Sequence, residues 1–400
     1  MVLIVVTDPT RFQGRGEMGG TTADFQISPS SWNRFEECPR KYWLSRQRLP
    51  RKASMAASMG TAIHNSVEDL CNLDFSGRGD EEIGWLHSSC RETLQKRWEE
   101  ERKLFSETPR HPRWKDESFS IALDGLIGAI SILFDKAMLP LEELSSVTVK
   151  TWKQVQDIVV ATEAILESKC GRLTGRLDLL IKDLGDGGNG GLIVADLKTG
   201  KPPEDELSEK VSRQLLFYRD IMKENVTENQ DLRAEGWYSS NNTVYRAEGP
   251  PILEEAIGAW EMMKLTETPF QATPSEDACS FCEWKAWCPR WWEAKYKGEL
   301  SHEGMFRDEV VRLVRIDQES GAALFERTTP VGGDGELKGS DHRFGALLKG
   351  RCLEKIRQMD QAELDGYLFL GSIMFGGKTA RMGDWSEILP WSPLLRSVRN

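Results

Sequence analysis

The feature that most constrains the fold is a pair of apolar segments joined by a glycine-rich turn near the middle of the chain. "GRLTGRLDLLIKDL" (171–184) alternates apolar and polar residues, "GDGGNGG" (185–191) follows, and "LIVADLKTG" (192–200) is almost continuously apolar. Two such runs around a Gly/Asn turn predict a β-hairpin. Helical patterns lie on both sides of it, so we expect an α/β fold with a small mixed sheet flanked by helices.

The segment before the hairpin, residues 25–145, is predicted to be mostly helical. "SPSSWNRFEECPRKYWLSR" begins with serines and a proline suited to a helix start, and a second helix is expected from Gly60. Two longer helical patterns cover residues 83–106 and 117–138. After the hairpin, we expect a helix over 207–223, a strand pair in "EGWYSSNNTVYRAE" and a helix in "ILEEAIGAWEMMKLTE".

The composition predicts three parts of the chain. Residues 1–24 are rich in glycine and lack periodicity, which favours a flexible arm. Residues 25–298 form the α/β domain with its helical N-terminal insertion. Residues 303–400 contain the short strand patterns "DEVVRLVRID", "GAALFER", "FGALLKG" and "GYLFLGSIMFG", which predict a small OB-like β-barrel.

The net charge of −11 does not indicate a polyanionic partner, so a nucleic-acid surface would have to be local. The segment 40–52 has six basic residues and no acid. Basic groups neutralise phosphates and aromatic rings stack on bases, whereas the alternative is a solvated helix face. The candidate nucleic-acid-binding residues are Arg40, Lys41, Tyr42, Trp43, Arg46 and Arg48.

The apolar segments favour a cytoplasmic protein with no membrane association. The longest uncharged apolar run in the interior of the chain, Leu126–Phe134, is shorter than the ~18 residues of a spanning helix. "MVLIVV" at the start is short and has no basic region before it, so we do not expect a secretory signal.

Three charged residues of the hairpin strands are candidates for chemistry. Asp196 and Lys198 are two positions apart and therefore share one face of a strand, and Asp178 lies on the preceding strand. Two carboxylates on paired strands suit a hard divalent cation, and a protonated lysine beside it suits water positioning and charge stabilisation during phosphodiester hydrolysis. The alternative is an ion pair on an edge strand.

Three further residues are uninformative when each is taken alone. His64 follows Ile63 in "GTAIHNSVEDL", where a histidine packed in the core is the ordinary interpretation. Gln214 and Tyr218 share a helix face at i and i+4.

Six short motifs together resemble a known family. Their order is "SPSSWNRFEECPRKYWL", "GTAIH", "GRLDLL", "VADLKTG", "QLLFY" and "CSFCEWKAWC", over roughly residues 25 to 292. This order and spacing resemble the RecB-type nucleases of the PD-(D/E)XK superfamily, in the iron–sulfur branch that includes the AddB nuclease domain and CRISPR-associated RecB-like nucleases.

The resemblance implies a role for each polar residue. His64, Asp178, Asp196 and the carbonyl of Leu197 would bind Mg²⁺ or Mn²⁺, and Lys198 would be the catalytic lysine. Gln214 and Tyr218 match the Q-x-x-x-Y motif, which helps to position the DNA and the active site. Asp196 stands where many superfamily members have Glu, and the branch tolerates this change.

Four of the cysteines are candidates for a second metal site. Cys279, Cys282 and Cys288 have the spacing C-x2-C-x5-C, and Cys38, in the same local sequence "CPR" as Cys288, is the candidate for a fourth ligand. The alternatives are a structural zinc site and loop cysteines without a function. The resemblance implies a 4Fe-4S cluster that joins the N-terminal helix to the end of the nuclease domain.

The sequence therefore predicts a metal-dependent DNA nuclease, an exonuclease on single strands or DNA ends, in DNA repair, recombination or phage defence. The alternative is a catalytically minor DNA-binding or scaffold subunit of a CRISPR adaptation or recombination complex. The chain has no G-x-x-x-x-G-K-[ST] motif, so a partner helicase would be a different chain.

Overall fold

The computed structural model describes residues 25–185, 190–226, 230–301, 304–376 and 379–398. The flexible arm predicted for residues 1–24 and part of the predicted turn at 185–191 lie outside these ranges. The chain divides into two compact units, each built from segments distant in sequence. The first unit comprises Met1–Asn33, Ser54–Glu107 and Trp114–Lys264, and the second comprises Arg34–Ala53, Thr108–Arg113 and Leu265–Asn400.

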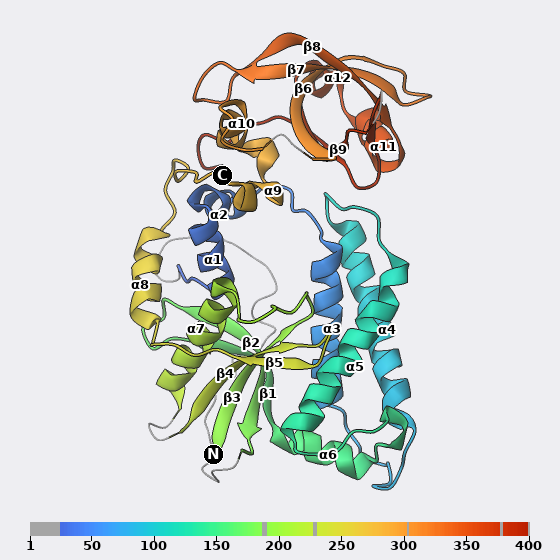
Figure 1. The fold of residues 1–400 in the computed structure, drawn as a ribbon, viewed down its shortest axis with the longest axis vertical. Coiled ribbons are helices and arrows are strands. Elements are labelled where there is room, and N and C mark those ends of the chain that lie inside the picture. Colours follow the sequence, from blue (N-terminus) through green and yellow to red (C-terminus); the bar gives the residue numbers. More distant parts are fainter. Residues whose placement is uncertain (1–24, 186–189, 227–229, 302–303, 377–378, 399–400) are drawn as a thin grey trace. The chain divides into compact units, whose positions relative to one another are not determined.

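The first unit contains a five-stranded mixed sheet in the order β1-β2-β3-β4-β5. Only β3 and β4 run parallel, and the other neighbours are antiparallel. The hairpin predicted from the sequence is β2-β3, and the predicted strand pair is β4-β5 (Figure 1). The strands are β1 (Val159–Glu167), β2 (Thr174–Asp183), β3 (Gly191–Lys198), β4 (Leu232–Tyr238) and β5 (Thr243–Arg246).

Helices cover this sheet. One hydrophobic core joins Ile63, Leu126 and Trp152 on the helices to Ile181 and Ile193 on the strands. Helix α7 contacts β3 and β4, so β3 is buried along almost its whole length. The helices in and around this unit are α1 (Pro29–Glu37), α3 (Met55–Cys71), α4 (Trp85–Glu107), α5 (Phe119–Lys136), α6 (Val149–Ile158), α7 (Glu209–Asn225) and α8 (Leu253–Met262), with short 3-10 turns η2 (Asp116–Ser118) and η3 (Leu144–Ser146).

Two helix boundaries differ from the sequence prediction and a third helix, α6, has no counterpart among the predicted helices, each for a local reason. The expected N-terminal helix is divided at Cys38, which is extended because it precedes a proline. Helix α3 begins five residues before Gly60, where the Ser54 side chain accepts a hydrogen bond from the amide of Ala57. Helix α6 occupies a stretch with strand-like alternation, and Thr148 caps it by accepting from the amide of Thr151 at 3.1 Å.

The helical segment Asp116–Lys136 is long and apolar enough to cross a membrane by length and composition. Half of its most apolar window is buried inside the protein. Its residues Leu126, Ile130 and Phe134 are fully buried, and they belong to the same core as the sheet. Core packing therefore accounts for the apolar character of this helix.

The second unit contains a six-stranded sheet in the order β10-β8-β7-β6-β9-β11. The four strand patterns predicted after residue 303 are confirmed as β6 to β9, and helix α11 lies between β8 and β9. Strand β10 pairs parallel to β8 and also meets β9 through Arg381 and Met374. The strands are β6 (Phe306–Ile316), β7 (Ala322–Pro330), β8 (Leu337–Leu348), β9 (Tyr367–Met374), β10 (Ala380–Met382) and β11 (Glu387–Pro390).

A tryptophan-rich core holds the cysteine-bearing segments against this sheet. Trp43, Trp284 and Trp291 pack in one cluster with Val310 and Phe369. The contacts therefore group residues 265–301 with the C-terminal strands, whereas the sequence suggested a boundary between 298 and 303. The helical elements of this unit are α2 (Pro39–Ser45), α9 (Glu276–Ser280), η4 (Lys285–Trp287), α10 (Pro289–Tyr296), α11 (Gly350–Gln358) and α12 (Gln361–Asp365).

Candidate active site

The antiparallel register of β2 and β3 brings two carboxylates together. Leu179 pairs with Ala195, so the next position places Asp178 opposite Asp196. The backbone amide of Leu197 donates a hydrogen bond to Asp178 Oδ2 at 2.6 Å. The hairpin predicted from the sequence thus produces the predicted convergence of the two acids.

Helix α7 adds an amide and a phenol to the face of β3 that carries the acid and the lysine. Lys198 Nζ lies 2.6 Å from Asp196 Oδ2 and donates to Gln214 Oε1 at 2.9 Å. Gln214 Nε2 donates to Asp196 Oδ1 at 2.6 Å and contacts the Tyr218 hydroxyl at 3.2 Å. The structure therefore brings all four of these predicted residues into one hydrogen-bonded group.

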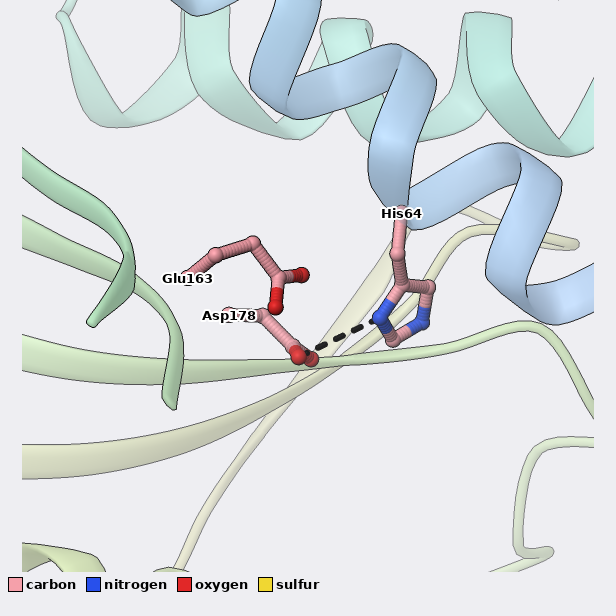
Figure 2. Close-up of side chains that lie close together, drawn as sticks. All are labelled: His64, Glu163 and Asp178. Carbon is pink, nitrogen blue, oxygen red and sulfur yellow. Dashed lines mark ion pairs between the residues drawn. The ribbon is translucent and has the colours of Figure 1, made fainter. Parts of the chain in front are cut away.

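A histidine and a third acid complete the cluster (Figure 2). His64 on α3 places Nδ1 3.2 Å from Asp178 Oδ1. One ligand atom each from His64, Glu163 and Asp178 lies within 4.8 Å of the others, a spacing that fits a single metal ion. Glu163 was absent from the predicted site.

Only the tertiary structure identifies Glu163. Thr162 pairs with Leu179 and Ala164 pairs with Leu177, which places Glu163 opposite Asp178 across the β1-β2 ladder. Its backbone has φ 50°, in the left-handed region that a non-glycine residue seldom adopts. Such conformations cluster at functional sites. In the sequence, "ATEAILE" contains no motif that distinguishes this glutamate.

The crowding of acids shifts several pKa values. Burial, with the nearby charge of Asp178, raises the pKa of Asp196 to about 6 although Lys198 opposes the shift. Burial and the charge of Asp178 likewise raise the pKa of Glu163 to about 7. Burial acts to lower the pKa of His64, but Asp178 outweighs it and raises this pKa to about 9.

These residues fit a divalent cation. Carboxylate oxygens and an imidazole nitrogen are common ligands of such ions. Asp196 is only 3% exposed, and its Oδ2 has no hydrogen bond of good geometry within the described residues, although Lys198 lies beside it. Without a cation, the carboxyl groups must either hold protons or repel one another, and each of these states costs free energy. A bound cation would remove this cost.

The comparison with known families decides the class of this site. A model of the PD-(D/E)XK nuclease superfamily matches residues 26–289. The chain belongs to the PD-(D/E)XK nuclease superfamily. This membership implies a metal-dependent phosphodiester hydrolase with DNA as its substrate. No curated protein matches the chain at a significant level.

The superfamily match includes the four candidate ligand cysteines, which all lie in the second unit. Cys38, Cys279, Cys282 and Cys288 line one small cavity. Cys38 and Cys288 are buried, and Cys279 and Cys282 are partly buried.

The basic segment of this PD-(D/E)XK protein is only partly available for nucleic acid. Tyr42 and Trp43 are fully buried, and the Trp43 indole donates to the Thr266 carbonyl at 3.0 Å, so the predicted stacking of bases on these rings would require the segment to unfold. Arg40 is also buried, and it donates to the Leu394 carbonyl at 3.2 Å.

The remaining three basic residues of this prediction are accessible to different degrees. Lys41 forms an ion pair with Glu37 at 2.9 Å. Arg46 and Arg48 are exposed. The sequence could not distinguish these positions from the buried ones, because tertiary packing decides which face of a short helix is covered.

Proposed function

We propose that the chain is a Mg²⁺- or Mn²⁺-dependent deoxyribonuclease of the RecB-type branch that acts on single-stranded DNA or DNA ends. The observation that carries the proposal is the meeting of His64, Glu163 and Asp178 beside the Asp196–Lys198 pair. A structural ion pair on an edge strand would not require these additional groups. It would also be more exposed than Asp196, which is buried in a central strand.

Each residue has a separate task in this proposal. His64, Glu163, Asp178 and Asp196 would hold the cation, and the Leu197 carbonyl is a further candidate ligand on the basis of family resemblance. A divalent cation supplies Lewis-acid chemistry and charge neutralisation at a phosphodiester. Hydrogen bonds from the Leu197 amide to Asp178 and from Gln214 to Asp196 hold the two carboxylates in place.

Lys198 is the proposed catalytic residue. Asp196 and Gln214 fix its ammonium group, so the positive charge is in place before reaction. From there it can orient the attacking water and stabilise negative charge that develops on the phosphoryl oxygens. Tyr218 supports the side chain of Gln214 and is a positioning residue.

End-labelled single-stranded and duplex DNA incubated with Mn²⁺ would test this function. We expect the parent to cleave and Lys198→Ala to lose about 10²-fold or more in rate, the usual effect of removing a preorganised charge-stabilising group. Lys201→Ala is a matched control, because the Lys201 side chain is 82% exposed. Equal cleavage by the parent, Lys198→Ala and Asp196→Ala would overturn the assignment.

We further propose that the four cysteines hold a 4Fe-4S cluster, with zinc as the alternative. The four cysteines line one small cavity, which supports a common metal group, and the family resemblance favours the cluster over zinc. Burial raises the pKa of the Cys288 thiol to about 11 and that of Cys282 to about 12, so binding must displace protons from both thiols. The group would connect Cys38 to residues about 240 positions later and stabilise the second unit.

Spectroscopy distinguishes the two metals. A cluster gives a broad visible absorbance that dithionite bleaches, whereas zinc gives none. We expect Cys282→Ser to be colourless and poorly soluble, and Cys170→Ser, at an exposed free cysteine, to keep the colour of the parent. A colourless parent with one zinc per chain would contradict the cluster.

We infer that β6 to β10 form an OB-like barrel. The support is that β10 pairs with two strands, parallel to β8 and antiparallel to β9. This pairing connects the two ends of the β8-β7-β6-β9 sheet and closes it.

A cytoplasmic location, a role in repair, recombination or phage defence, and a partner helicase or CRISPR-associated protein remain predictions. A scaffold subunit would bind DNA without cleaving it, and the digestion above separates that alternative from the enzyme.

A further inference from the structure

Two cavities in the second unit adjoin at one exposed tryptophan, Trp385. The first cavity has a volume of about 540 Å³, and its wall includes Phe281 and Phe306. The second has a volume of about 280 Å³, and its wall includes His111 and Arg351. Trp385 lies in the wall of both. We call the combined surface the Trp385 tract.

Three aromatic rings in the tract are open to solvent. The exposed fractions are 94% for Phe281, 54% for Phe306 and 50% for Trp385. A single exposed aromatic residue is ordinary, but three around one cavity form a patch of the kind that binds a partner. Unpaired nucleobases stack on such rings with a gain of about 1–3 kcal/mol per base.

Two arginines in the tract have no carboxylate partner within the described residues. Arg351 donates to the Pro112 carbonyl at 3.2 Å and lies against the ring of His111. Arg307 lies with its guanidinium 5.4 Å from the Phe375 ring. Their charges are not neutralised by an acid, so both are available for phosphate groups.

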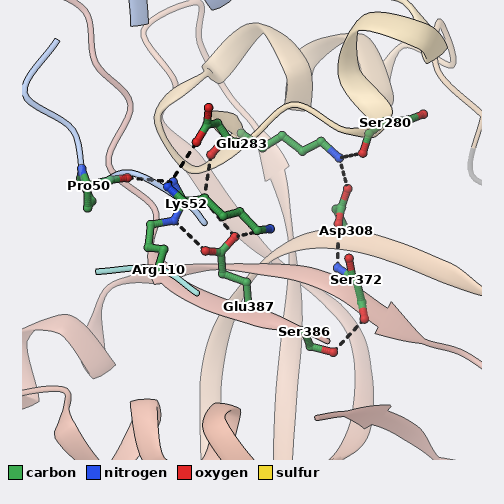
Figure 3. A network of polar contacts seen from close by, with 10 residues as sticks. Pro50, Lys52, Arg110, Ser280, Glu283, Asp308, Ser372, Ser386 and Glu387 are labelled. Atoms are coloured by element: carbon green, nitrogen blue, oxygen red, sulfur yellow. Dashed lines mark hydrogen bonds and ion pairs between the residues drawn. The ribbon is translucent and has the colours of Figure 1, made fainter. Parts of the chain in front are cut away.

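Several other charges in the two cavities are paired and form a fixed floor (Figure 3). Four more charged residues of the walls form no ion pair within the described residues, and they are Glu276, Glu354, Lys355 and Asp384. Arg110 pairs with Glu387 at 2.6 Å and donates to the Glu283 carbonyl at 2.8 Å, and Lys52 also pairs with Glu387. Lys285 pairs with Asp308 in the first cavity. The tract therefore combines two arginines that have no carboxylate partner within the described residues with a floor in which several charges are paired.

The floor of the first cavity contains a backbone outlier. Ser372 has φ 55°, and Asp308 accepts a hydrogen bond from its amide at 2.8 Å. The Ser386 hydroxyl donates to the Ser372 carbonyl at 2.8 Å. The pairing of β6 with β9 shifts register here, between Arg307 and Glu309, so the left-handed Ser372 belongs to a β-bulge that shapes the cavity floor.

We propose that the Trp385 tract binds single-stranded DNA, with bases stacked on Phe281, Phe306 and Trp385 and phosphates near Arg307 and Arg351. A duplex would not fit this chemistry, because its bases are already stacked on one another. The choice of DNA rests on the proposed nuclease function. The existence of a single-strand site rests on the rings and charges of the second unit.

The test is binding of a fluorescein-labelled oligothymidylate to the full chain as purified. EDTA in the buffer prevents cleavage. An oligonucleotide of about 20 nucleotides exceeds the ~4–16 nucleotides that one such module covers. We expect Trp385→Ala and Phe281→Ala each to weaken binding about fivefold or more, the loss of roughly one stacked base. Phe281 is almost fully exposed, so its removal costs no core packing.

Matched controls separate the tract from general surface effects. Tyr296→Ala removes an aromatic side chain that is 60% exposed and outside both cavities, and we expect it to bind as the parent does. Arg307→Ala and Arg351→Ala should each reduce the slope of log K against log salt by about 0.7, the value for one phosphate contact on a single strand. Arg315→Ala, at an exposed arginine outside both cavities, should leave the slope unchanged.

The outcomes distinguish this proposal from the nuclease proposal. A parent that binds the strand through these residues but does not cleave with Mn²⁺ would uphold the tract and refute the nuclease. A parent that cleaves while Trp385→Ala and Phe281→Ala bind normally would refute the tract alone. Equal competition by duplex DNA or by oligouridylate would also overturn the proposed single-stranded DNA site. If the chain does not bind the strand at all, the proposal is likewise wrong, and the Trp385 tract would be a surface for a protein partner.

Discussion

The two units treat buried charge in opposite ways. In the first unit, Glu163, Asp178 and Asp196 crowd around His64, and burial with the charge of Asp178 raises the pKa values of Glu163 and Asp196 although Lys198 and Arg176 lie beside them. In the second unit, Glu387 is matched by Arg110 and Lys52. The first arrangement costs stability unless a ligand compensates, and the second contributes to stability on its own. This difference separates a binding site from a structural network.

Breaking the structural network should have the largest effect. Arg110→Met leaves Glu387 buried with only Lys52 as a partner, and we expect a loss of about 3 kcal/mol of unfolding free energy, the low end for breaking a buried pair. Chemical denaturation would measure it. Arg78→Ala, in the exposed pair with Glu82, should change stability by about 1 kcal/mol or less. If Arg110→Met and Arg78→Ala reduce the unfolding free energy by the same amount, the buried network of the second unit is not a stabilising structure.

Adding a divalent cation should have the next largest effect, in the first unit. Mn²⁺ at 100 times its dissociation constant should stabilise the parent by about 2.7 kcal/mol relative to EDTA. Asp178→Asn removes one ligand and should lose most of this gain, which thermal unfolding with and without Mn²⁺ would show. A parent whose unfolding temperature does not respond to Mn²⁺ would contradict the proposed cation site.

Acid should reduce the stability of the second unit through Glu387. Burial acts to raise the pKa of this carboxyl, but Arg110 and Lys52 outweigh it and hold the pKa below its ordinary value. The stabilisation is therefore present above the unfolded pKa of about 4.3 and is lost as the pH falls through the lower folded value. The stability difference between the parent and Glu387→Gln should narrow between about pH 5 and the acid limit. If the stability difference between the parent and Glu387→Gln does not change with pH, the charge of Glu387 contributes nothing to stability.

The smallest effect should come from Glu163 in the metal-free protein. Glu163→Gln removes a negative charge near Asp178 and also the pair with Arg176 at 2.5 Å. These effects oppose each other, so we expect a change of about 1 kcal/mol or less in EDTA, together with weaker Mn²⁺ binding. Calorimetric titration with Mn²⁺ would measure the affinity. A large loss of stability in EDTA would make Glu163 a structural residue.

Local patterns in the sequence predicted much of the site. The alternation before the glycine-rich turn and the apolar run after it determine a hairpin, and the period of two places Asp196 and Lys198 on one face. The i, i+4 spacing likewise places Gln214 and Tyr218 together on α7. These features depend on neighbours along the chain, so the sequence contains them directly.

Other features depend on segments that are distant in sequence. Glu163 enters the cluster only because the β1-β2 register places it opposite Asp178. Tyr42 and Trp43 look like nucleic-acid contacts in the sequence, but the second unit buries both. The meeting of Phe281 and Trp385 at one cavity likewise has no signal in the sequence, because about 100 residues separate them.

The sequence by itself determined the hairpin, the acid and lysine on one strand face and the spacing of the cysteines, because each follows from backbone periodicity over a few residues. The tertiary structure decided which charges are balanced, which aromatic rings are buried and which acid joins His64 and Asp178. Burial and register arise from packing between distant segments, and no local pattern specifies them.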